Sequence, residues 1–148
     1  MQVFLYAFTV VTGVLNAVQP GLNTTLNRSL DQPFVAAMTV TLVSFASLLL
    51  AGLVAGRLAL PDGGAFASVP WWGWFGGTLG AVYVLAQLFV APRIGAAAFM
   101  GLAVTAAIVT SVALDHFGLI GFEEHPAGFG RLAGAALMIV GVLLVARY

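Results

Sequence analysis

A row of neutral polar side chains runs through an otherwise apolar stretch near the N-terminus. Its members recur at steps of three and four residues, as Thr9, Thr12, Asn16, Gln19 and Asn23. Steps of this size bring side chains onto one face of an α-helix. Amide and hydroxyl groups donate and accept hydrogen bonds without carrying a charge. The pattern therefore predicts a hydrophobic helix that lines a polar cavity for a small solute.

A proline near the end of this row supports the same interpretation. Pro20 has no N–H to donate to the carbonyl of Asn16, and its ring crowds that carbonyl. We expect a kink here, with a backbone acceptor beside the side chains of Asn16 and Gln19. The two threonines of the row are assigned the simpler role of joining helices. The amides of Asn16, Gln19 and Asn23 need several partners each when buried, so they are the main candidates for the cavity wall.

Other neutral polar residues are secondary candidates for the same cavity. Tyr83 and Gln87 lie four residues apart and would share one helical face. Ser44 lies in the middle of another apolar run. Together with the three amides of the row, these residues make up the predicted substrate-binding set.

Three charged residues are candidates for gating or for an ion pair. Asp115 lies near the end of an apolar run, and ionisable groups in such runs are costly and often functional. Arg57 and Arg131 are expected on the same side of the membrane, so an ion pair at the interface or a loop cap is the favoured interpretation. In an antiparallel dimer Asp115 would also share a side with Arg93 and Arg28 of the other subunit, and this second pairing could form a gate. Arg93 lies in a short turn, where it could hold the turn and reach lipid headgroups, or take part in gating.

The sequence holds no pattern that points to catalysis. Cysteine is absent, which excludes disulfides and thiol chemistry. His116 and His125 are separated by a loop that carries Glu123 and Glu124, a spacing too loose for a zinc site. Neither a nucleophile with an adjacent base nor a phosphate-binding loop is found. We therefore expect no enzyme activity, no metal and no cofactor.

Composition places the chain in a membrane. Of its 148 residues, 61% are hydrophobic and 7% are charged, whereas soluble domains carry about 25% charged residues. The formal net charge is zero and all five basic residues are arginines, so nothing suggests a nucleic-acid partner or a basic lipid-binding patch. The lipid bilayer is the expected surrounding.

Five apolar segments are long enough to cross a bilayer, which needs about 20 residues. They predict an all-α integral membrane protein with a single transmembrane domain over residues 1–148. The spans are expected at about 3–27, 34–56, 71–91, 95–117 and 131–145. No basic residues precede the first apolar run, so we interpret it as a retained span rather than a signal peptide.

Tryptophans and glycines indicate how these spans are placed and packed. Trp71, Trp72 and Trp74 open the third span and are interpreted as an interfacial aromatic belt, with stacking on a substrate as the alternative. Small residues recur along two spans and predict close helix contacts. These stripes are Gly73, Gly76, Gly77 and Gly80 in the third span, and Gly130, Gly134, Met138 and Gly141 in the fifth.

The loop charges contain no orientation signal. Five spans put the termini on opposite sides, so Arg57 and Arg131 fall on one side of the membrane. The other side receives Arg28, Arg93 and Arg147. Two against three is no bias of the kind that orients membrane proteins. Such a chain can insert both ways and pair as an antiparallel homodimer, which would enclose a cavity; the alternative is a noisy count of few charges.

Several short motifs, taken in order, resemble one family of small membrane proteins. They are Gln19-Pro20-Gly21-Leu22-Asn23, Pro70-Trp71-Trp72-Gly73-Trp74-Phe75-Gly76-Gly77, Ala81-Val82-Tyr83-Val84, Pro92-Arg93-Ile94-Gly95-Ala96, Asp115-His116-Phe117-Gly118 and Arg131-Leu132-Ala133-Gly134. Their order and spacing are similar to those of the YdcZ-type family of the drug/metabolite transporter superfamily. The resemblance implies half of a ten-span transporter, found as dual-topology homodimers, opposed pairs or fused repeats. It also implies an exporter of the bacterial inner membrane with an undefined substrate.

The chain departs from the family pattern in its fourth span. Where the family is expected to carry Gly-Gln before a Ser-x-x-x-Asp pattern, this sequence has Ala106-Ala107. If that Gln lines the family's cavity, a polar contact has been lost here. No span contains a central carboxylate, so the proton-for-cation exchange of the related small multidrug transporters cannot be carried over. An amide-lined cavity favours neutral or zwitterionic solutes.

These observations predict a small-solute transporter that works as an antiparallel homodimer by alternating access. Asn16, Gln19 and Asn23 of both subunits would surround its central cavity. A passive ion channel formed by such a dimer is the alternative from another class. A third possibility is an inactive partner of a second, oppositely oriented subunit.

Overall fold

The computed structural model describes residues 2–59 and 61–148, and every regular element in that part of the chain is helical. Five stretches are long and apolar enough to cross a membrane, which confirms the predicted five-span, all-α class. They are α1 (Gln2–Leu30), α2 (Pro33–Val54), the stretch Trp71–Ile94, α6 (Ala96–Phe117) and α7 (Phe129–Arg147). The third stretch contains the 3₁₀ helix η1 (Trp71–Trp74), α4 (Phe75–Phe89) and α5 (Ala91–Ile94).

The helix bounds differ from the expected ones mainly at turns. The third span stays helical to Ile94 instead of ending at residue 91. It stops where Gly95 adopts a φ of +87°, a conformation that residues with a Cβ rarely take. A short helix, α3 (Gly63–Ala67), lies within the expected loop before Pro70. α1 continues as one helix through Pro20, from Gln2 to Leu30.

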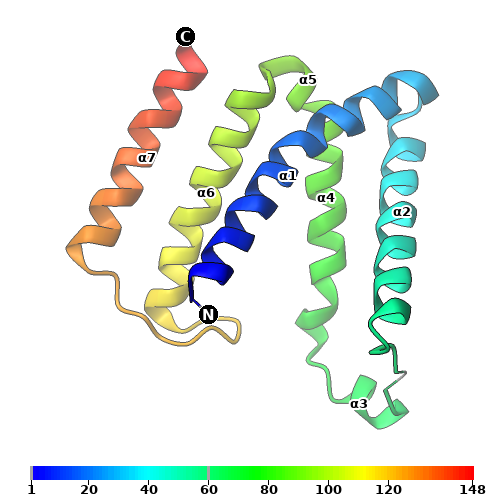
Figure 1. Cartoon of the computed structure of the whole chain (residues 1–148). Coiled ribbons are helices and arrows are strands. Elements are labelled where there is room, and N and C mark those ends of the chain that lie inside the picture. Colours follow the sequence, from blue (N-terminus) through cyan, green and yellow to red (C-terminus); the bar gives the residue numbers. More distant parts are fainter. Residues whose placement is uncertain (1, 60) are drawn as a thin grey trace. The chain divides into compact units, whose positions relative to one another are not determined.

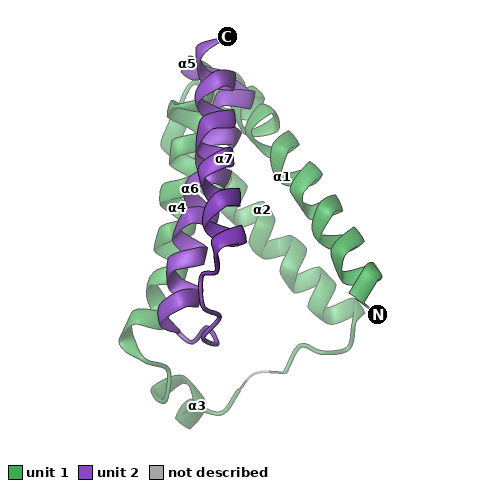
Figure 2. Ribbon diagram, turned by 90° about the vertical axis from the view of Figure 1, so that its left-hand side faces the viewer, with its two compact units in different colours: residues 1–92 green, residues 93–148 purple. Residues whose placement is uncertain are grey.

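The chain forms two compact units, residues 1–92 and residues 93–148 (Figure 2). In the first unit, α1 packs against both α2 and α4, and α2 packs against α4 (Figure 1). Ala36 of α2 and Leu88 of α4 are almost completely buried. This three-helix arrangement holds the predicted amide row of α1 beside α4.

In the second unit, α6 and α7 form a hairpin joined by residues 118–128. Gly101 of α6 allows the close approach, because a Cβ added to it would lie 2.7 Å from Cγ2 of Val142 in α7. Gly118 ends α6 with a φ of +58°, in the left-handed conformation common after helix C-termini. The loop then folds back against the end of α6.

The predicted glycine stripes are not where the described helices come closest. A Cβ added to Gly76, Gly77 or Gly80 would meet nothing within 4 Å, and the same holds for every glycine of the α7 stripe. Close contact between α6 and α7 uses Gly101 instead, because the rotation of each helix decides which face meets its neighbour. Of the stripe members, Gly73 lies close to Val69, where an added Cβ would be 3.1 Å from Cγ1, and Met138 is half-buried, whereas the other glycines have open space beside them.

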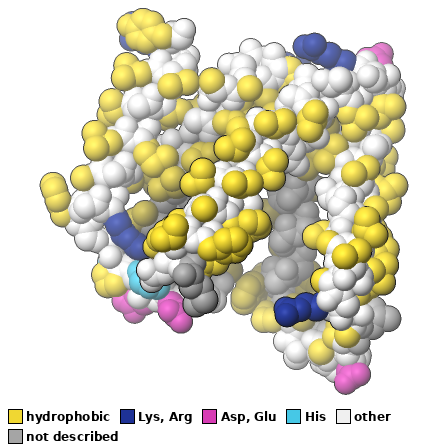
Figure 3. Space-filling view, in the orientation of Figure 1, with side chains coloured by type: hydrophobic (Ala, Val, Ile, Leu, Met, Phe, Trp, Pro, Cys, Tyr) yellow, Lys and Arg dark blue, Asp and Glu magenta, His cyan; other side chains and the backbone are white. Residues whose placement is uncertain are grey.

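Hydrophobic side chains cover the length of the helices, whereas the charged ones lie near helix ends and in loops (Figure 3). Leu48 in the middle of α2, for example, is 73% exposed. A surface of this kind is stable in lipid, where apolar side chains face hydrocarbon and each helix satisfies its own backbone. The fold thus agrees with a multi-pass membrane protein.

Candidate functional site

Three amide side chains form a hydrogen-bonded chain between α1 and α4. Nδ2 of Asn23 donates to Oε1 of Gln87 over 2.6 Å. Nε2 of Gln87 in turn donates to Oε1 of Gln19 over 3.5 Å. The structure therefore brings together three of the predicted cavity residues, two from the amide row and one from the secondary set.

This amide chain is anchored in the interior. Gln87 is completely buried and Asn23 is 5% exposed. Pro20, between Gln19 and Asn23, is also fully buried. Buried amides are costly unless they are hydrogen-bonded, and here Asn23 and Gln87 satisfy each other. Gln19 lies at the outer end of the chain, half-buried, where it can meet both the interior and a solute.

Gln19 also lines an open hollow along α1 with a volume of about 450 Å³. The polar residues of its wall are Thr12, Asn16 and Gln19. The apolar ones are Leu15, Val18 and Leu22. The hollow follows the central turns of a 29-residue helix, so it would lie at mid-depth in a bilayer. Its exposed lining is mostly apolar, with three residues of the predicted row, Thr12, Asn16 and Gln19, as its polar members.

The two threonines of the row bond within their own helix. The hydroxyl of Thr9 donates to the carbonyl of Leu5 over 2.9 Å, and that of Thr12 to the carbonyl of Thr9 over 2.7 Å. We expected them to join neighbouring helices, and the structure shows this shorter-range alternative. A hydroxyl reaches the carbonyl one turn earlier without any help from tertiary packing.

The two remaining neutral candidates lie apart from the hollow wall. Ser44 is exposed on α2 and its hydroxyl donates to the carbonyl of Val40 over 2.9 Å, so its hydrogen is used inside its own helix. Tyr83 is half-buried on α4, one turn before Gln87. Of the secondary set, Gln87 is hydrogen-bonded to the amide row, through Asn23 and Gln19.

A second hollow, of about 580 Å³, lies between α2 and α4 and was not expected from the sequence. Its wall is almost entirely apolar, with Phe34, Met38, Phe45 and Leu85 among its larger side chains. Thr41 is its polar member, and its hydroxyl is bonded to the carbonyl of Ala37. Apolar side chains of this kind also face lipid, so the sequence contained no signal for a groove.

Asn27 is a polar residue at the expected end of the first span, about residues 3–27. It lies in the last turns of α1, and its Oδ1 is buried without a hydrogen-bond partner in the described part of the chain. Asn27 follows Asn23 by four residues and therefore continues the amide row by one turn. That spacing was the signal that could have identified it.

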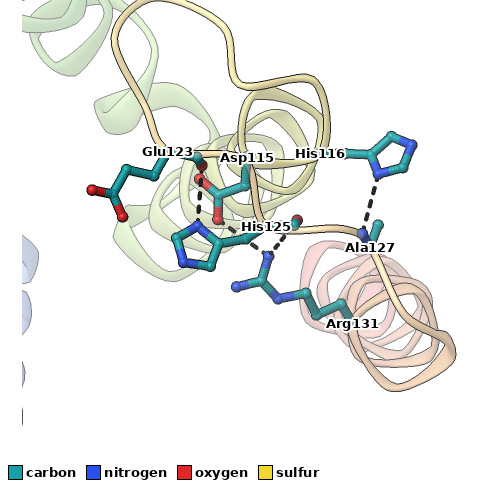
Figure 4. Close-up of polar contacts among 6 residues, drawn as sticks. All are labelled: Asp115, His116, Glu123, His125, Ala127 and Arg131. Carbon is teal, nitrogen blue, oxygen red and sulfur yellow. Dashed lines mark hydrogen bonds and ion pairs between the residues drawn. The ribbon is translucent and has the colours of Figure 1, made fainter.

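The charged candidates form a cluster at the end of the α6–α7 hairpin (Figure 4). Nη1 of Arg131 lies 3.3 Å from Oδ2 of Asp115. The same nitrogen donates to the carbonyl of His125 over 3.2 Å. His125 also donates its backbone N–H to the carbonyl of Asp115 over 2.7 Å. The arrangement is the expected ion pair, and it fastens the loop to both helices.

The two histidines bond to loop backbone. Nδ1 of His116 accepts the N–H of Ala127 over 3.2 Å, and Nδ1 of His125 lies 3.1 Å from the carbonyl of Glu123 (Figure 4). Arg93 is exposed on α5. Among the described residues, no group of three or more His, Asp or Glu side chains is placed to hold a metal ion.

The tryptophans lie together at the start of the third span. Trp71, Trp72 and Trp74 are all exposed on η1. Trp74 stacks on Phe66 with 6.2 Å between ring centroids, and Trp71 meets Phe75 edge-on at 5.9 Å. Exposed aromatic rings at the end of a span are what an interfacial belt requires.

Comparison with known proteins agrees with this architecture. Residues 4–144 match the family described as "Putative inner membrane exporter, YdcZ". The chain is 29% identical over 147 residues to the protein named "Inner membrane protein YdcZ" of Escherichia coli (strain K12), which covers 99% of this chain and 97% of that protein. No solved structure shows a significant match.

The matched family accounts for nearly the whole chain, including all five membrane-spanning stretches. It confirms the family that the ordered motifs predicted, and it places the protein in the inner membrane as a multi-pass protein. The family is described by export across the membrane rather than by catalysis. The chain belongs to the YdcZ family of inner membrane proteins.

Proposed function

We propose that this protein is a small-solute transporter that works as an antiparallel homodimer by alternating access. The observation that carries the proposal is the hollow on α1, in which Thr12, Asn16 and Gln19 present hydrogen-bonding groups halfway along a spanning helix. Polar groups at this depth are costly in lipid. They are stable where they line a water-filled or solute-filled space.

The amide chain gives that surface a rigid support. Gln19 is connected through Gln87 to Asn23, so the polar wall of α1 is fixed to α4 rather than free to rotate. A transporter needs such a fixed wall, because a solute is selected by groups whose positions do not change during binding. The apolar half of the wall, with Leu15 and Leu22, would contact the carbon skeleton of the solute.

A second copy would complete the site. The described wall of the hollow consists of α1 residues, so a closed cavity needs another surface facing it. A twofold axis in the membrane plane would bring the middle of one α1 opposite the middle of the other, as in inverted-repeat transporters. The even distribution of arginines between the two sides permits both orientations of one chain.

The charged cluster supports a structural role beside the transport path. Asp115 and Arg131 are paired within one subunit, with their side chains 28% and 44% exposed. This pairing favours a structural role, in which the ion pair holds the α6–α7 loop. It disfavours the alternative, a gate formed by Asp115 of one subunit and Arg93 of the other. In the proposed mechanism, opening and closing therefore depend on the two copies of the α1 wall.

Cross-linking of single cysteines tests the antiparallel dimer. The chain contains no cysteine, so each introduced thiol is the only one in the subunit. Asn16→Cys, at the middle of α1, is expected to cross-link to its own copy with a short bis-methanethiosulfonate. Leu5→Cys lies on the same face but roughly three turns nearer the N-terminus, so two copies would be at opposite ends of the dimer. Self-cross-linking of both Leu5→Cys and Asn16→Cys would indicate a parallel pair and contradict the proposal.

Orientation and transport are tested separately. A topology reporter fused after Tyr148 should give both inside and outside signals in intact cells; a single orientation would reject the homodimer and favour a pair with a second, opposed subunit.

Transport is measured in proteoliposomes loaded with labelled uncharged and zwitterionic metabolites. Gln19→Leu should abolish solute movement, and the double variant Gln19→Leu/Asn16→Cys should still form cross-linked dimers. Currents far above transporter turnover in a bilayer recording would replace the transporter with a channel.

A further inference from the structure

Gln87 decides which end of the Gln19 amide faces the hollow. Nε2 of Gln87 donates to Oε1 of Gln19, so the oxygen of Gln19 is directed towards the interior of the protein. An amide nitrogen carries two donor hydrogens and no acceptor. Gln19 also lines the hollow, and we take its NH₂ end, which this hydrogen bond does not use, to be the end that meets a solute. To a bound solute, Gln19 is a hydrogen-bond donor.

The orientation of Gln87 is itself held from the other side. Nδ2 of Asn23 donates to Oε1 of Gln87 over 2.6 Å. Turning the Gln87 amide over would set its NH₂ group against the NH₂ group of Asn23. Because Gln87 is completely buried, water cannot replace the lost partner, and turning Gln87 without turning Asn23 would leave polar groups unpaired.

Two further polar groups of this helix face act as acceptors. The hydroxyl hydrogen of Thr12 is used by the carbonyl of Thr9, which leaves the lone pairs of the Thr12 oxygen as acceptors. The backbone carbonyl of Asn16 receives no N–H from Pro20 and is a second acceptor. Donor and acceptor ends, at Gln19 and Thr12, are separated by two helical turns, roughly 10 Å. From Gln19 to Thr12 the wall thus runs from a donor to an acceptor, and the side-chain amide of Asn16, which carries both, lies between them.

The wall is also free of charge. Its polar members are amides and a hydroxyl, and its remaining members are leucine and valine. A charged solute would exchange its water shell for neutral groups only, which is unfavourable at this depth. An uncharged solute with one apolar side loses much less on entry.

We propose that the hollow on α1 binds an uncharged, amphipathic solute that offers a hydrogen-bond acceptor to Gln19 and a donor towards Thr12 or Asn16. Gln87 is the positioning residue that enforces this order without touching the solute. The inference rests on the proposed transporter function, because it takes the hollow to be part of an aqueous cavity.

A reporter thiol in the hollow tests the proposal without requiring transport. Leu15→Cys lines the hollow and leaves all of its polar groups in place. The full-length protein in lipid vesicles is treated with methanethiosulfonates that carry a neutral hydroxyethyl, an anionic sulfonatoethyl or a cationic trimethylammonioethyl group. Each rate is divided by the rate of the same reagent with N-acetylcysteine. Val14→Cys, at the same depth on another face of α1, is the matched control and should be unreactive with the charged reagents.

The expected rates follow from the lining. The neutral reagent should modify Leu15→Cys about tenfold faster than either charged one, because the wall offers no counter-charge. Of the two charged reagents, the anionic one should be faster by about threefold, because the NH₂ group of Gln19 faces it. In the Gln87→Met background Gln19 is free to turn, and this anion-to-cation ratio should fall to about one. Gln19→Met should remove the preference in the same way.

The outcomes separate the two proposals. An anion-to-cation ratio that is unchanged in both methionine variants, or a charged reagent that outpaces the neutral one, would overturn the inference about Gln87 and the uncharged solute. Failure of every reagent to reach Leu15→Cys would show that the hollow is not aqueous, and both proposals would fall. The expected rates combined with no solute movement in proteoliposomes would leave the binding inference standing and reject transport.

Discussion

Nδ2 of Asn23 in α1 and Oε1 of Gln87 in α4 are 2.6 Å apart, in a part of the protein where both side chains are almost fully buried. The two residues are 64 positions apart in the sequence. Their hydrogen bond fixes the rotation of α1 against α4 and, with it, the direction in which Asn16 and Gln19 face. The polar wall of the proposed transport cavity therefore depends on a contact that a solute never touches.

Breaking this pair from one side should destabilise the protein. Asn23→Leu leaves Oε1 of Gln87 buried without a donor, which is expected to cost about 1–3 kcal/mol of folding free energy. The apparent melting temperature of the purified protein in detergent should fall accordingly. The double variant Asn23→Leu/Gln87→Leu removes both polar groups and should recover part of the loss. A double variant less stable than the sum of the two single changes would contradict this account.

Asn27 provides the matched opposite case one turn further along α1. Its Oδ1 is buried without a partner in the described part of the chain, so replacing the side chain removes an unpaired group rather than a bonded one. Asn27→Leu should leave the melting temperature unchanged or raise it. The free energy of unfolding should increase by up to about 1 kcal/mol. A loss comparable to that of Asn23→Leu would show that Asn27 has a partner, such as an ordered water or a second subunit.

Gly101 and Val142 define the closest approach of α6 and α7. Since a Cβ on residue 101 would lie 2.7 Å from Cγ2 of Val142, Gly101→Ala should destabilise the protein by about 1–3 kcal/mol. Val142→Ala removes that methyl group and should restore part of the stability in the double variant. Gly13→Ala, where an added Cβ meets nothing within 4 Å, is the control and should be neutral or stabilising. Equal melting temperatures for the Gly101 and Gly13 variants would refute the close contact.

Arg131 should matter more to the order of the α6–α7 loop than to overall stability. Its ion pair with Asp115 is partly exposed, and such pairs contribute about 0–1 kcal/mol. Arg131 also donates to the carbonyl of His125, so Arg131→Gln should speed hydrogen exchange at the backbone N–H of His125, which bonds to the carbonyl of Asp115. Asp115→Asn, which keeps a hydrogen-bond acceptor for Arg131, should have a smaller effect. Exchange at His125 that is the same in both variants and the unmodified protein would argue against this anchoring.

Features with a helical period could be predicted from the sequence alone. Five apolar runs were sufficient for the five spans, and steps of three and four residues placed Asn16, Gln19 and Asn23 on one face of α1. Both follow from local geometry, because the spacing of residues along a single helix determines which side chains share a face. The ordered motifs were likewise enough to identify the family.

Choices between partners required the tertiary structure. The row of amides had several possible partners, and packing of α1 on α4 selected Gln87 for Asn23 and Gln19. Glycine stripes predicted close contacts on α4 and α7, yet the described close approach uses Gly101 of α6. The rotation and depth of each helix relative to its neighbours set these choices. Rotation and depth depend on side chains far apart in the sequence, so no local pattern in the chain contains them.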